Sequence, residues 1–242
     1  MISCVVDAHK HAEVASRTPE FMANEATKPF GWYAALFTEW ATVTQMLHAA
    51  GVRPGGRVLD VGCGNGWTSL FLAEAGYDVL GVDLVPANVE LARARAQRWG
   101  SSARFAVGDM ETLDLDVDDG FAAALLFDAL HHAQRQRDVL AAVARHLAPG
   151  GWLLLGEPSW LHRFSPEARR TTRELGWLER GLTVRGLRRD LRAAGFGKAR
   201  RFFQGTAPYE GWRVGPQLAR LLGARLLAAP QHHLWLAAQR AA

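Results

Sequence analysis

A strand that runs into a glycine-rich turn is the feature that most constrains this chain. Residues 58–66 read Val-Leu-Asp-Val-Gly-Cys-Gly-Asn-Gly, an apolar run that breaks into three glycines at alternate positions. In α/β proteins such a turn brings the backbone close to a nucleotide-like ligand. We therefore expect an α/β protein with a ligand site at the end of this strand.

The spacing of the glycines argues against a pyrophosphate ligand. A dinucleotide-binding turn reads G-x-G-x-x-G, and counting from Gly62 and Gly64 puts Trp67 in the third place. The third glycine, Gly66, comes one residue early, and Asp60 precedes the turn. A carboxylate there repels phosphates and attracts a cation in a site of reduced dielectric. The ligand indicated is a cationic nucleoside such as S-adenosylmethionine, which carries sulfonium and ammonium groups.

The pattern Asp60-x-Gly62-x-Gly64-x-Gly66 resembles the first motif of class I S-adenosylmethionine-dependent methyltransferases. The resemblance is strong over roughly residues 55–157 and holds only in outline elsewhere. It implies that S-adenosylmethionine is the cofactor and that this turn, including Cys63, binds it. The alternative is a tight strand-to-helix turn without a ligand.

Strands and helices alternate through the middle of the chain. Expected strands at 57–61, 78–82, 104–107, 121–127 and 152–156 are separated by expected helices at 67–75, 86–99 and 137–147. This alternation predicts a doubly wound parallel sheet. Two later strands, 198–203 and 233–239, would pair antiparallel according to the resemblance. The predicted fold is α/β, a doubly wound, mostly parallel seven-stranded sheet with an antiparallel C-terminal strand.

We expect a single methyltransferase domain over residues 1–242. Residues 1–50 are a predicted N-terminal helical cap, irregular or in short helices up to residue 30 and then helical. Residues 51–158 are the cofactor-binding core. Residues 159–242 supply substrate-side helices, expected at 166–180 and 184–194, and the last strands.

Acidic residues follow the second and third expected strands. Asp83 lies 21 residues after Gly62, where an acid in nucleoside-binding α/β folds hydrogen-bonds the ribose. By resemblance, Asp109 accepts from the adenine amino group and Met110 covers the ring, although a loop Asp that caps a turn is the alternative. Two further residues are grouped with the cofactor-binding residues: Leu84, which follows Asp83, and Phe127, the last residue of the fourth expected strand.

The fourth expected strand opens into Asp128-Ala-Leu-His131-His132, where class I methyltransferases present substrate-facing residues. The Asn/Asp-Pro-Pro-aromatic motif of adenine-N6 and cytosine-N4 enzymes is missing, and so is a Pro-Cys nucleophile. The sequence looks instead like small-molecule methyltransferases, including those that act on quinones, sterols and sugars. Asp128 is assigned to the substrate side.

A hydroxyl acceptor benefits from a general base, and histidine serves best near neutral pH. His131 and His132 are the candidates, and at most one faces the substrate if strand geometry continues past residue 127. Glu157, at the end of the fifth strand, is a weaker candidate. The alternative is that these histidines shape the pocket or cap the next helix.

The expected helix at 31–50 carries apolar residues at three- and four-residue spacing. It packs on the sheet or over the ligand mouth, and the resemblance implies that N-terminal helices form part of a lid. Trp32 and Tyr33 are the candidate lid residues, with core packing as the alternative.

Charge is divided unevenly along the chain. Residues 1–160 hold 12 Lys/Arg and 19 Asp/Glu, whereas residues 161–242 hold 16 and 5. A basic half suits an anionic substrate, a membrane surface or nucleic acid, and a solvated arginine-rich surface is the alternative. An amphipathic helix expected within 206–230 packs on the domain or a second subunit in preference to a membrane.

Two cysteines, a start without signal-peptide character and no long apolar run predict a cytoplasmic protein without a disulfide framework or a metal site. The function expected is S-adenosylmethionine-dependent methylation of a small molecule, favouring an oxygen nucleophile on a natural product, sugar or lipid-linked metabolite. The alternatives are an RNA methyltransferase that uses the basic half, and a non-catalytic partner protein on the same fold. Nucleic acid is the less favoured partner, and a homodimer is left open.

Overall fold

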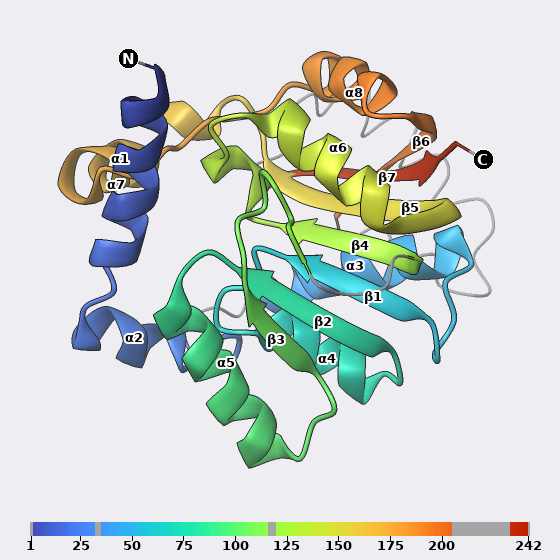
Figure 1. The fold of residues 1–242 in the computed structure, drawn as a ribbon, viewed down its shortest axis with the longest axis horizontal. Helices are drawn as coiled ribbons and strands as arrows, with labels where there is room; N and C mark the ends of the chain where they lie inside the picture. The colour runs from blue at the N-terminus through green and yellow to red at the C-terminus, as the bar shows by residue number, and fades with distance from the viewer. Residues whose placement is uncertain (1, 32–34, 116–119, 205–232, 242) are drawn as a thin grey trace.

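The fold was analysed in a computed structural model, which describes residues 2–31, 35–115, 120–204 and 233–241. Figure 1 shows one sheet with helices on both faces. The strands are β1 (Arg57–Val61), β2 (Asp78–Asp83), β3 (Arg104–Val107), β4 (Phe121–Phe127), β5 (Leu147–Pro158), β6 (Phe196–Phe202) and β7 (His233–Arg240). The helices are α1 (Ile2–Ala15), α2 (Pro19–Glu25), α3 (Ala35–Ala50), α4 (Trp67–Glu74), α5 (Pro86–Trp99), α6 (Gln136–His146), α7 (Pro166–Leu175) and α8 (Val184–Ala193), with short 3₁₀ turns η1 (Leu130–His132) and η2 (His162–Phe164).

The sheet has seven strands in the order β3-β2-β1-β4-β5-β7-β6. The first five strands pair parallel, and β7 runs antiparallel to both β5 and β6. The predicted fold class is therefore confirmed. The topological switch point lies between β1 and β4, because β2 and β3 follow on one side of β1 and β4 lies on the other. In open α/β sheets, ligands bind outside the carboxyl ends of the strands at such a point.

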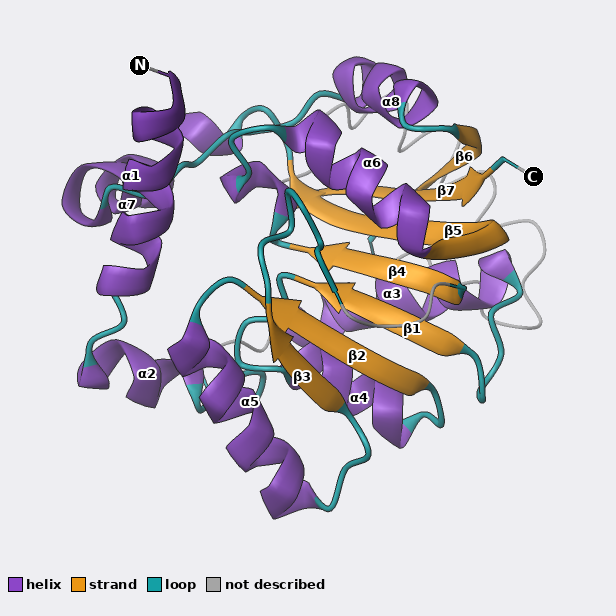
Figure 2. Cartoon of the chain, in the orientation of Figure 1, coloured by secondary structure: helices purple, strands orange, loops and turns teal. Residues whose placement is uncertain are grey.

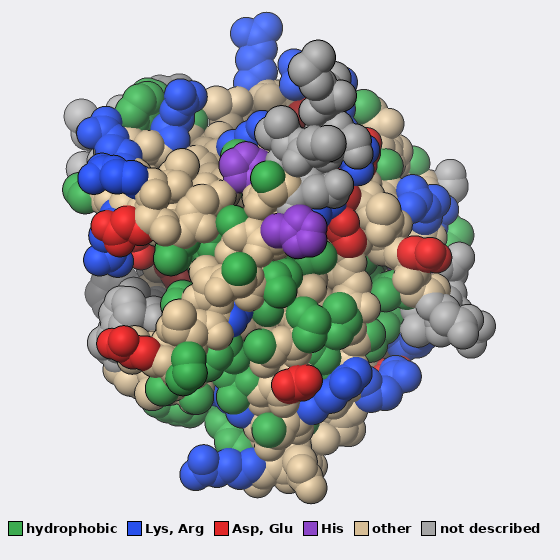
Figure 3. All heavy atoms as spheres, turned by 60° about the vertical axis from the view of Figure 1, so that its left-hand side comes forward, with side chains coloured by type: hydrophobic (Ala, Val, Ile, Leu, Met, Phe, Trp, Pro, Cys, Tyr) green, Lys and Arg blue, Asp and Glu red, His purple; other side chains and the backbone are tan. Residues whose placement is uncertain are grey.

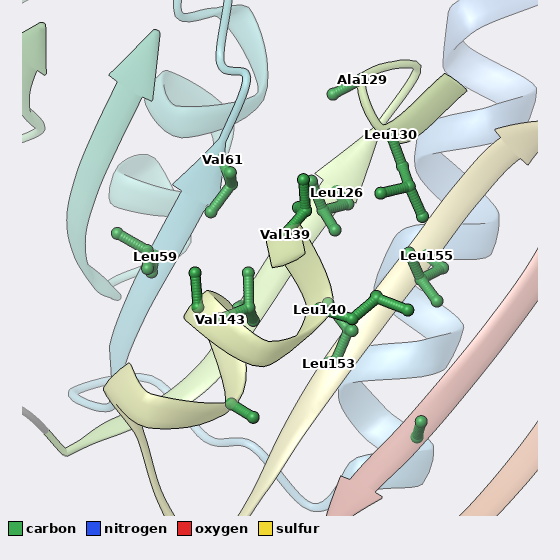
Figure 4. Packing of buried hydrophobic residues seen from close by; sticks show 14 of the residues in the cluster. Leu59, Val61, Leu126, Ala129, Leu130, Val139, Leu140, Val143, Leu153 and Leu155 are labelled. Atoms are coloured by element: carbon green, nitrogen blue, oxygen red, sulfur yellow. The ribbon is translucent and has the colours of Figure 1, made fainter. Parts of the chain in front are cut away.

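Helices cover both faces of the sheet (Figure 2). Two clusters of buried apolar side chains hold them there. On one face, α6 presents Val139, Leu140 and Val143 to the sheet residues Leu126 and Leu155, as Figure 4 shows. On the other face, α3, α4 and α5 pack through a second cluster that includes Val43, Leu70 and Val89. Both faces of β4 are covered, which explains why this strand is a continuous apolar run.

The N-terminal region is more regular than the sequence indicated. Residues expected to be irregular or in short helices include the 14-residue helix α1. Helix α2 begins after Thr18, whose side chain accepts a hydrogen bond from the N–H of Phe21, with Pro19 in the first turn. Helix α3 contacts β5 and β7, so it belongs to the sheet layer, while α1 and α2 lie beside α7 near the carboxyl ends of the parallel strands (Figure 1).

Two element boundaries in the C-terminal half differ from expectation. Helix α7 stops at Leu175 because Gly176 takes a left-handed conformation, with φ of 72°. Strand β5 begins at Leu147, ahead of its expected start at residue 152, and its pairing with β4 shifts register between Phe121 and Ala123. The last two strands pair antiparallel as predicted, with β7 between β5 and β6.

The described helices include none long and apolar enough to cross a membrane. The amphipathic helix expected within 206–230, and the lid residues Trp32 and Tyr33, lie outside the described residues. Figure 3 shows the face on which α1, α2 and α7 lie, with hydrophobic side chains near its centre and Lys and Arg side chains around its margin.

Candidate active site

The glycine turn adopts the conformation that its sequence requires. Gly62, Gly64 and Gly66 have φ of 73°, 52° and 77°, where side chains are strained. The N–H groups of Gly62 and Cys63 both donate to the carbonyl of Val82, which ties the turn to β2. A Cβ at Gly62 would lie 2.5 Å from the Cβ of Ala129, whereas one at Gly64 would meet nothing within 4 Å. The turn is thus packed against the end of β4 and open above Gly64.

Asp60 does not face the ligand space. It is 1% exposed and accepts hydrogen bonds from the hydroxyls of Thr68 and Ser69, each at 2.6 Å. Burial raises its pKa to about 6, against the opposing effect of these hydrogen bonds. Its carboxylate therefore fastens the first turn of α4 beneath the glycine turn, and it is not among the residues that line the cavity described below.

Asp83 connects three parts of the site. Its Oδ2 accepts from the N–H of Gly64 at 2.8 Å, and its Oδ1 accepts from the N–H of Val85 and the amide of Asn88. Burial raises the pKa of this carboxyl. A carboxylate has about four acceptor positions, so three donors leave capacity for a ligand hydroxyl.

Asp109 lies at the rim. The ammonium of Lys10, from α1, lies 2.5 Å from Asp109 and 3.2 Å from Glu111. Among the neighbours of Asp109, Gly108 and Met110 line the cavity, and Asp109 does not. The aspartate is thus engaged in holding α1 to the loop after β3.

A cavity of about 630 Å³ joins these features. Glycine-turn residues and Asp83 line one side, and residues that follow β4 line another. Side chains of α1, α2 and α7 close over it. The sequence-predicted residues in its lining are Gly62, Cys63, Gly64, Asp83, Leu84, Met110, Phe127, Asp128 and His132. Burial raises the pKa of the Cys63 thiol well above its ordinary value, so this lining residue is not a thiolate nucleophile.

Residues of the N-terminal region contact Trp177 at the cavity. The guanidinium of Arg17 stacks on Trp177, with Cζ 4.4 Å from the ring centroid, and on Phe21 at 4.7 Å. The Trp177 indole N–H donates to Ser16 at 3.0 Å. Burial raises the pKa of Glu13, beside Arg17, to about 7.

Glu157 lies behind the cavity and organises the turn after β4. It is fully buried, and its two oxygens accept from the backbone N–H groups of Ala129, Leu130 and His131. The Nδ1 of His131 lies 2.9 Å from Oε2 of the same carboxylate. Glu157 is absent from the cavity lining, so its position favours a role in holding η1 over a direct role in proton transfer.

Strand geometry ends at Phe127, and the 3₁₀ turn η1 sets the two histidines differently from an extended strand. Their rings stack with centroids 3.9 Å apart. His131 is turned inward, where burial opposes protonation but its hydrogen bond to Glu157 and nearby carboxylates outweigh burial and raise its pKa. Only His132 of the pair lines the cavity.

His132 is held as a neutral imidazole. Its Nδ1 lies 2.8 Å from the carbonyl oxygen of Leu178. A carbonyl only accepts, so Nδ1 carries the proton and Nε2 keeps its lone pair. Burial, and then the charge of His131, lower the pKa of His132 to about 3.

Asp128 has a partner that sequence reasoning missed. Its φ is 50°, an uncommon conformation for a non-glycine residue. Nε2 of His233, the first residue of β7, lies 2.7 Å from Asp128 Oδ1. On the far side of the ring, Nδ1 lies 3.6 Å from Glu39 of α3. Nothing in the local sequence around Glu39 or His233 signals this cluster, because its members are brought together only by the sheet order.

These residues fit an S-adenosylmethionine cofactor. The glycine turn leaves open space above Gly64, where a side chain would otherwise stand. Asp83 retains acceptor capacity for hydroxyls, and Asp128 adds a carboxylate to the same cavity. The carboxylates in this lining suit a nucleoside with positive charge.

Comparison with known proteins shows similarity to methyltransferases. Residues 58–151 match the sequence profile of a family described as a methyltransferase domain. A ubiquinone biosynthesis O-methyltransferase of Bordetella avium is 32% identical over 126 residues, which cover 52% of this chain and 50% of that protein. The chain thus matches about half the length of this curated relative.

Solved structures share the fold. An S-adenosylmethionine-dependent methyltransferase from Mesorhizobium loti superposes with a TM-score of 0.63 at 23% identity, over 84% of this chain and 98% of that one. The 1,6-didemethyltoxoflavin-N1-methyltransferase of Burkholderia thailandensis gives a TM-score of 0.59 at 22% identity, over 100% and 89%. Residues 58–151 thus match a methyltransferase domain, and the chain is similar in fold to class I S-adenosylmethionine-dependent methyltransferases.

Proposed function

We propose that this chain transfers a methyl group from S-adenosylmethionine to an oxygen atom of a small molecule. One observation carries the proposal: a single cavity of about 630 Å³ brings the glycine turn and Asp83 together with the neutral imidazole of His132. Its volume falls in the range of small-molecule sites, about 300–1,000 Å³. The curated relative named as an O-methyltransferase supports the choice of oxygen.

When bound, the cofactor supplies a methyl group on a positively charged sulfur, which leaves as a neutral thioether when an acceptor oxygen attacks the carbon. The protein's share is to align the reactants and exclude water, and orientation of this kind can supply roughly 7–11 kcal/mol. The glycine turn and Asp83 fix one reactant. Helices α1, α2 and α7 cover the other.

His132 is the residue in position to accept the proton of the acceptor hydroxyl. Its Nδ1–H is committed to Leu178, so the proton goes to Nε2. With a pKa of about 3, the imidazole is a weak base. Proton transfer to so weak a base is uphill for any hydroxyl, but it is less uphill for an acidic hydroxyl than for an aliphatic alcohol, and it is aided when the oxygen bonds to the methyl carbon at the same time. We therefore favour a phenol-like or enol-like acceptor over an aliphatic alcohol.

The test begins with calorimetry of the full chain with S-adenosylmethionine, for which we expect saturable binding in the micromolar range. A panel of phenols, aliphatic alcohols and amines is then screened for release of S-adenosylhomocysteine, and phenols are expected to react. His132→Gln should lower kcat by about 10²–10⁴-fold while cofactor affinity is retained. Exposed His11→Gln, on α1, is the matched control. Absence of cofactor binding at high micromolar concentration would refute the proposal.

A further inference from the structure

Six carboxylates line the cavity, and Asp128 differs from the other five by lying beside both the glycine turn and His132. Asp83 accepts from three donors. Glu25 pairs with Lys28 at 2.8 Å and accepts from Asn65, and Glu13 is paired with Arg17. The remaining acids of the lining are Glu167 and Glu174 on α7, both exposed, and Asp128.

Asp128 lies between the part of the cavity lined by the glycine turn and the part lined by His132. It directly precedes Ala129, whose Cβ touches the glycine turn at Gly62, and it lies four residues before His132. Its side chain is 36% exposed and lines the cavity. Oδ1 is hydrogen-bonded to His233, and no second hydrogen bond to this carboxylate exists among the described residues. The carboxylate thus keeps acceptor capacity beside both the cofactor side and the acceptor side.

Two residues from distant parts of the chain hold this carboxylate. His233 lies between Asp128 and Glu39, with its two ring nitrogens directed at one acid each. Burial opposes protonation of the ring, but the hydrogen bond to Asp128 and both negative charges outweigh it and raise the pKa to about 9. The three side chains form a carboxylate–imidazolium–carboxylate chain.

The carboxyl group of Glu39, at the far end of this group of three side chains, is not fully hydrogen-bonded among the described residues. It is 8% exposed, and its Oε2 is buried without a hydrogen-bond partner among the described residues. A buried unpaired oxygen is costly and calls for an explanation. Its Oε1 faces His233, and burial raises the pKa of Glu39 to about 7 against the opposing effect of the His233 charge.

We propose that Asp128 is the carboxylate that recognises the positive charge of the cofactor's sulfonium, with His233 and Glu39 as positioning residues. This inference rests on the proposed function. The positive charge passes from sulfur across the methyl carbon to the acceptor oxygen during transfer, and an anion between the two sides of the cavity attracts it along that path. Asp60, beneath the turn, has its carboxylate committed to two hydroxyls and does not supply this anion.

The test compares S-adenosylmethionine with S-adenosylhomocysteine, which lacks the methyl group and the sulfonium charge but keeps the amino-acid and nucleoside parts. Calorimetry on the full chain gives the ratio of the two affinities for the wild type and each variant. In Asp128→Asn, this ratio should shift about tenfold against S-adenosylmethionine, because the opposite charge is lost while the shape is kept. Asn also tolerates the positive φ at this position, so the fold is expected to survive.

Glu39→Gln should shift the ratio in the same direction by a smaller factor, because it removes one negative charge and leaves His233 with one carboxylate. A purely structural role would weaken both ligands equally. Glu167→Gln is the matched control: its side chain lines the cavity but is exposed, so solvent screens it and the ratio should stay within about twofold of wild type.

Each outcome of the affinity measurements leads to a definite conclusion about Asp128. An unchanged ratio in Asp128→Asn overturns the inference and leaves the proposed function standing. Equal loss of both ligands also overturns it, because Asp128 would then act on the parts that they share. If the wild type binds neither ligand, the proposed function fails and this inference fails with it.

Discussion

Glu157 illustrates how a buried charge can shape a site without entering it. Three consecutive backbone N–H groups and the His131 ring surround its carboxylate. A carboxylate satisfied in this way fixes the direction of the chain after β4. The orientation of His132 toward the cavity follows from that turn.

Glu157→Gln should therefore destabilise the fold. The amide presents two N–H donors to a site that needs only acceptors, so we expect a loss of about 3 kcal/mol in the free energy of unfolding. Urea denaturation followed by circular dichroism measures it. The exposed acid Glu174, changed to Gln, should alter stability by less than about 0.5 kcal/mol. A similar small effect at Glu157 would contradict the role given to it.

His233 should make stability depend on pH on the alkaline side. Its pKa is about 9 in the folded chain and near 6.5 when unfolded. Between these values the folded state binds more protons, so stability is fully present below about pH 6.5 and falls as pH rises through 9. The loss is on the order of 2–3 kcal/mol.

The measurement is the free energy of unfolding from pH 6 to 10 for the wild type and for His233→Gln. The difference between the two should shrink as pH rises, since the imidazolium is the source of the stabilisation. A difference that stays constant over this range would assign the effect to packing of the ring against Trp235.

At the scale of elements, two glycines of the same turn, Gly62 and Gly64, have different surroundings. Gly62 and Gly64 both have positive φ, but only Gly62 abuts the end of β4. Asp60 secures the same turn from below through the first residues of α4.

Gly62→Ala and Gly64→Ala form a matched pair for this element. Gly64→Ala should cost about 1–2 kcal/mol of stability from backbone strain alone. Gly62→Ala should cost about 1–3 kcal/mol more, because the new methyl overlaps Ala129. Chemical denaturation of both variants gives the comparison. Equal losses would mean that Ala129 moves aside freely.

Helix α1 is joined to the loop after β3 and to the residue after α7 by polar contacts. Lys10 of α1 bridges Asp109 and Glu111, and Nδ1 of His9 lies 2.8 Å from the carbonyl of Gly176 after α7. These contacts are partly exposed, so each contributes modestly.

Lys10→Met should loosen the cap without unfolding the core, because Glu111 keeps Arg135 at 3.1 Å. We expect cofactor dissociation to accelerate by about fivefold, equivalent to about 1 kcal/mol, measured by stopped-flow displacement. Lys10→Arg, which keeps the charge, should behave nearly as wild type. An unchanged rate in Lys10→Met would show that closure does not depend on this bridge.

At the scale of the molecule, the strand order assembles the site. Parallel strands β1, β2 and β4 end at the same edge of the sheet, and antiparallel β7 starts there. This reversal places His233 beside Asp128, 105 positions earlier. Helix α3, from the other end of the described chain, adds Glu39.

Because the cavity lies between the sheet and the cap, a ligand should stabilise both together. Saturation with S-adenosylmethionine at about 100 times its Kd should add roughly 2.7 kcal/mol to the free energy of unfolding. Hydrogen exchange should slow in α1 and α7 as well as in the glycine turn. Protection confined to the turn would indicate that the cap does not close on the cofactor.

Local sequence patterns predicted much of the fold. Strands β1, β3 and β4 and helix α5 have the predicted bounds, because apolar runs and helix stops such as Gly100 act within a few residues. The position of Asp83 after the turn also follows from spacing alone. The direction of the Asp60 side chain could not be predicted. The sequence places an acid before the turn but does not show on which side of the turn its carboxylate is buried.

What the sequence by itself determined is the sheet and the glycine turn, since these depend on residues close together along the chain. What only the tertiary structure decided is which charges face the ligand. Asp60 lies beneath the turn with its carboxylate bound to Thr68 and Ser69, while Asp128 is exposed to the cavity and held by His233. The physical reason is that burial and pairing set the charge of an ionisable group, and both arise from contacts between segments that the sequence leaves far apart.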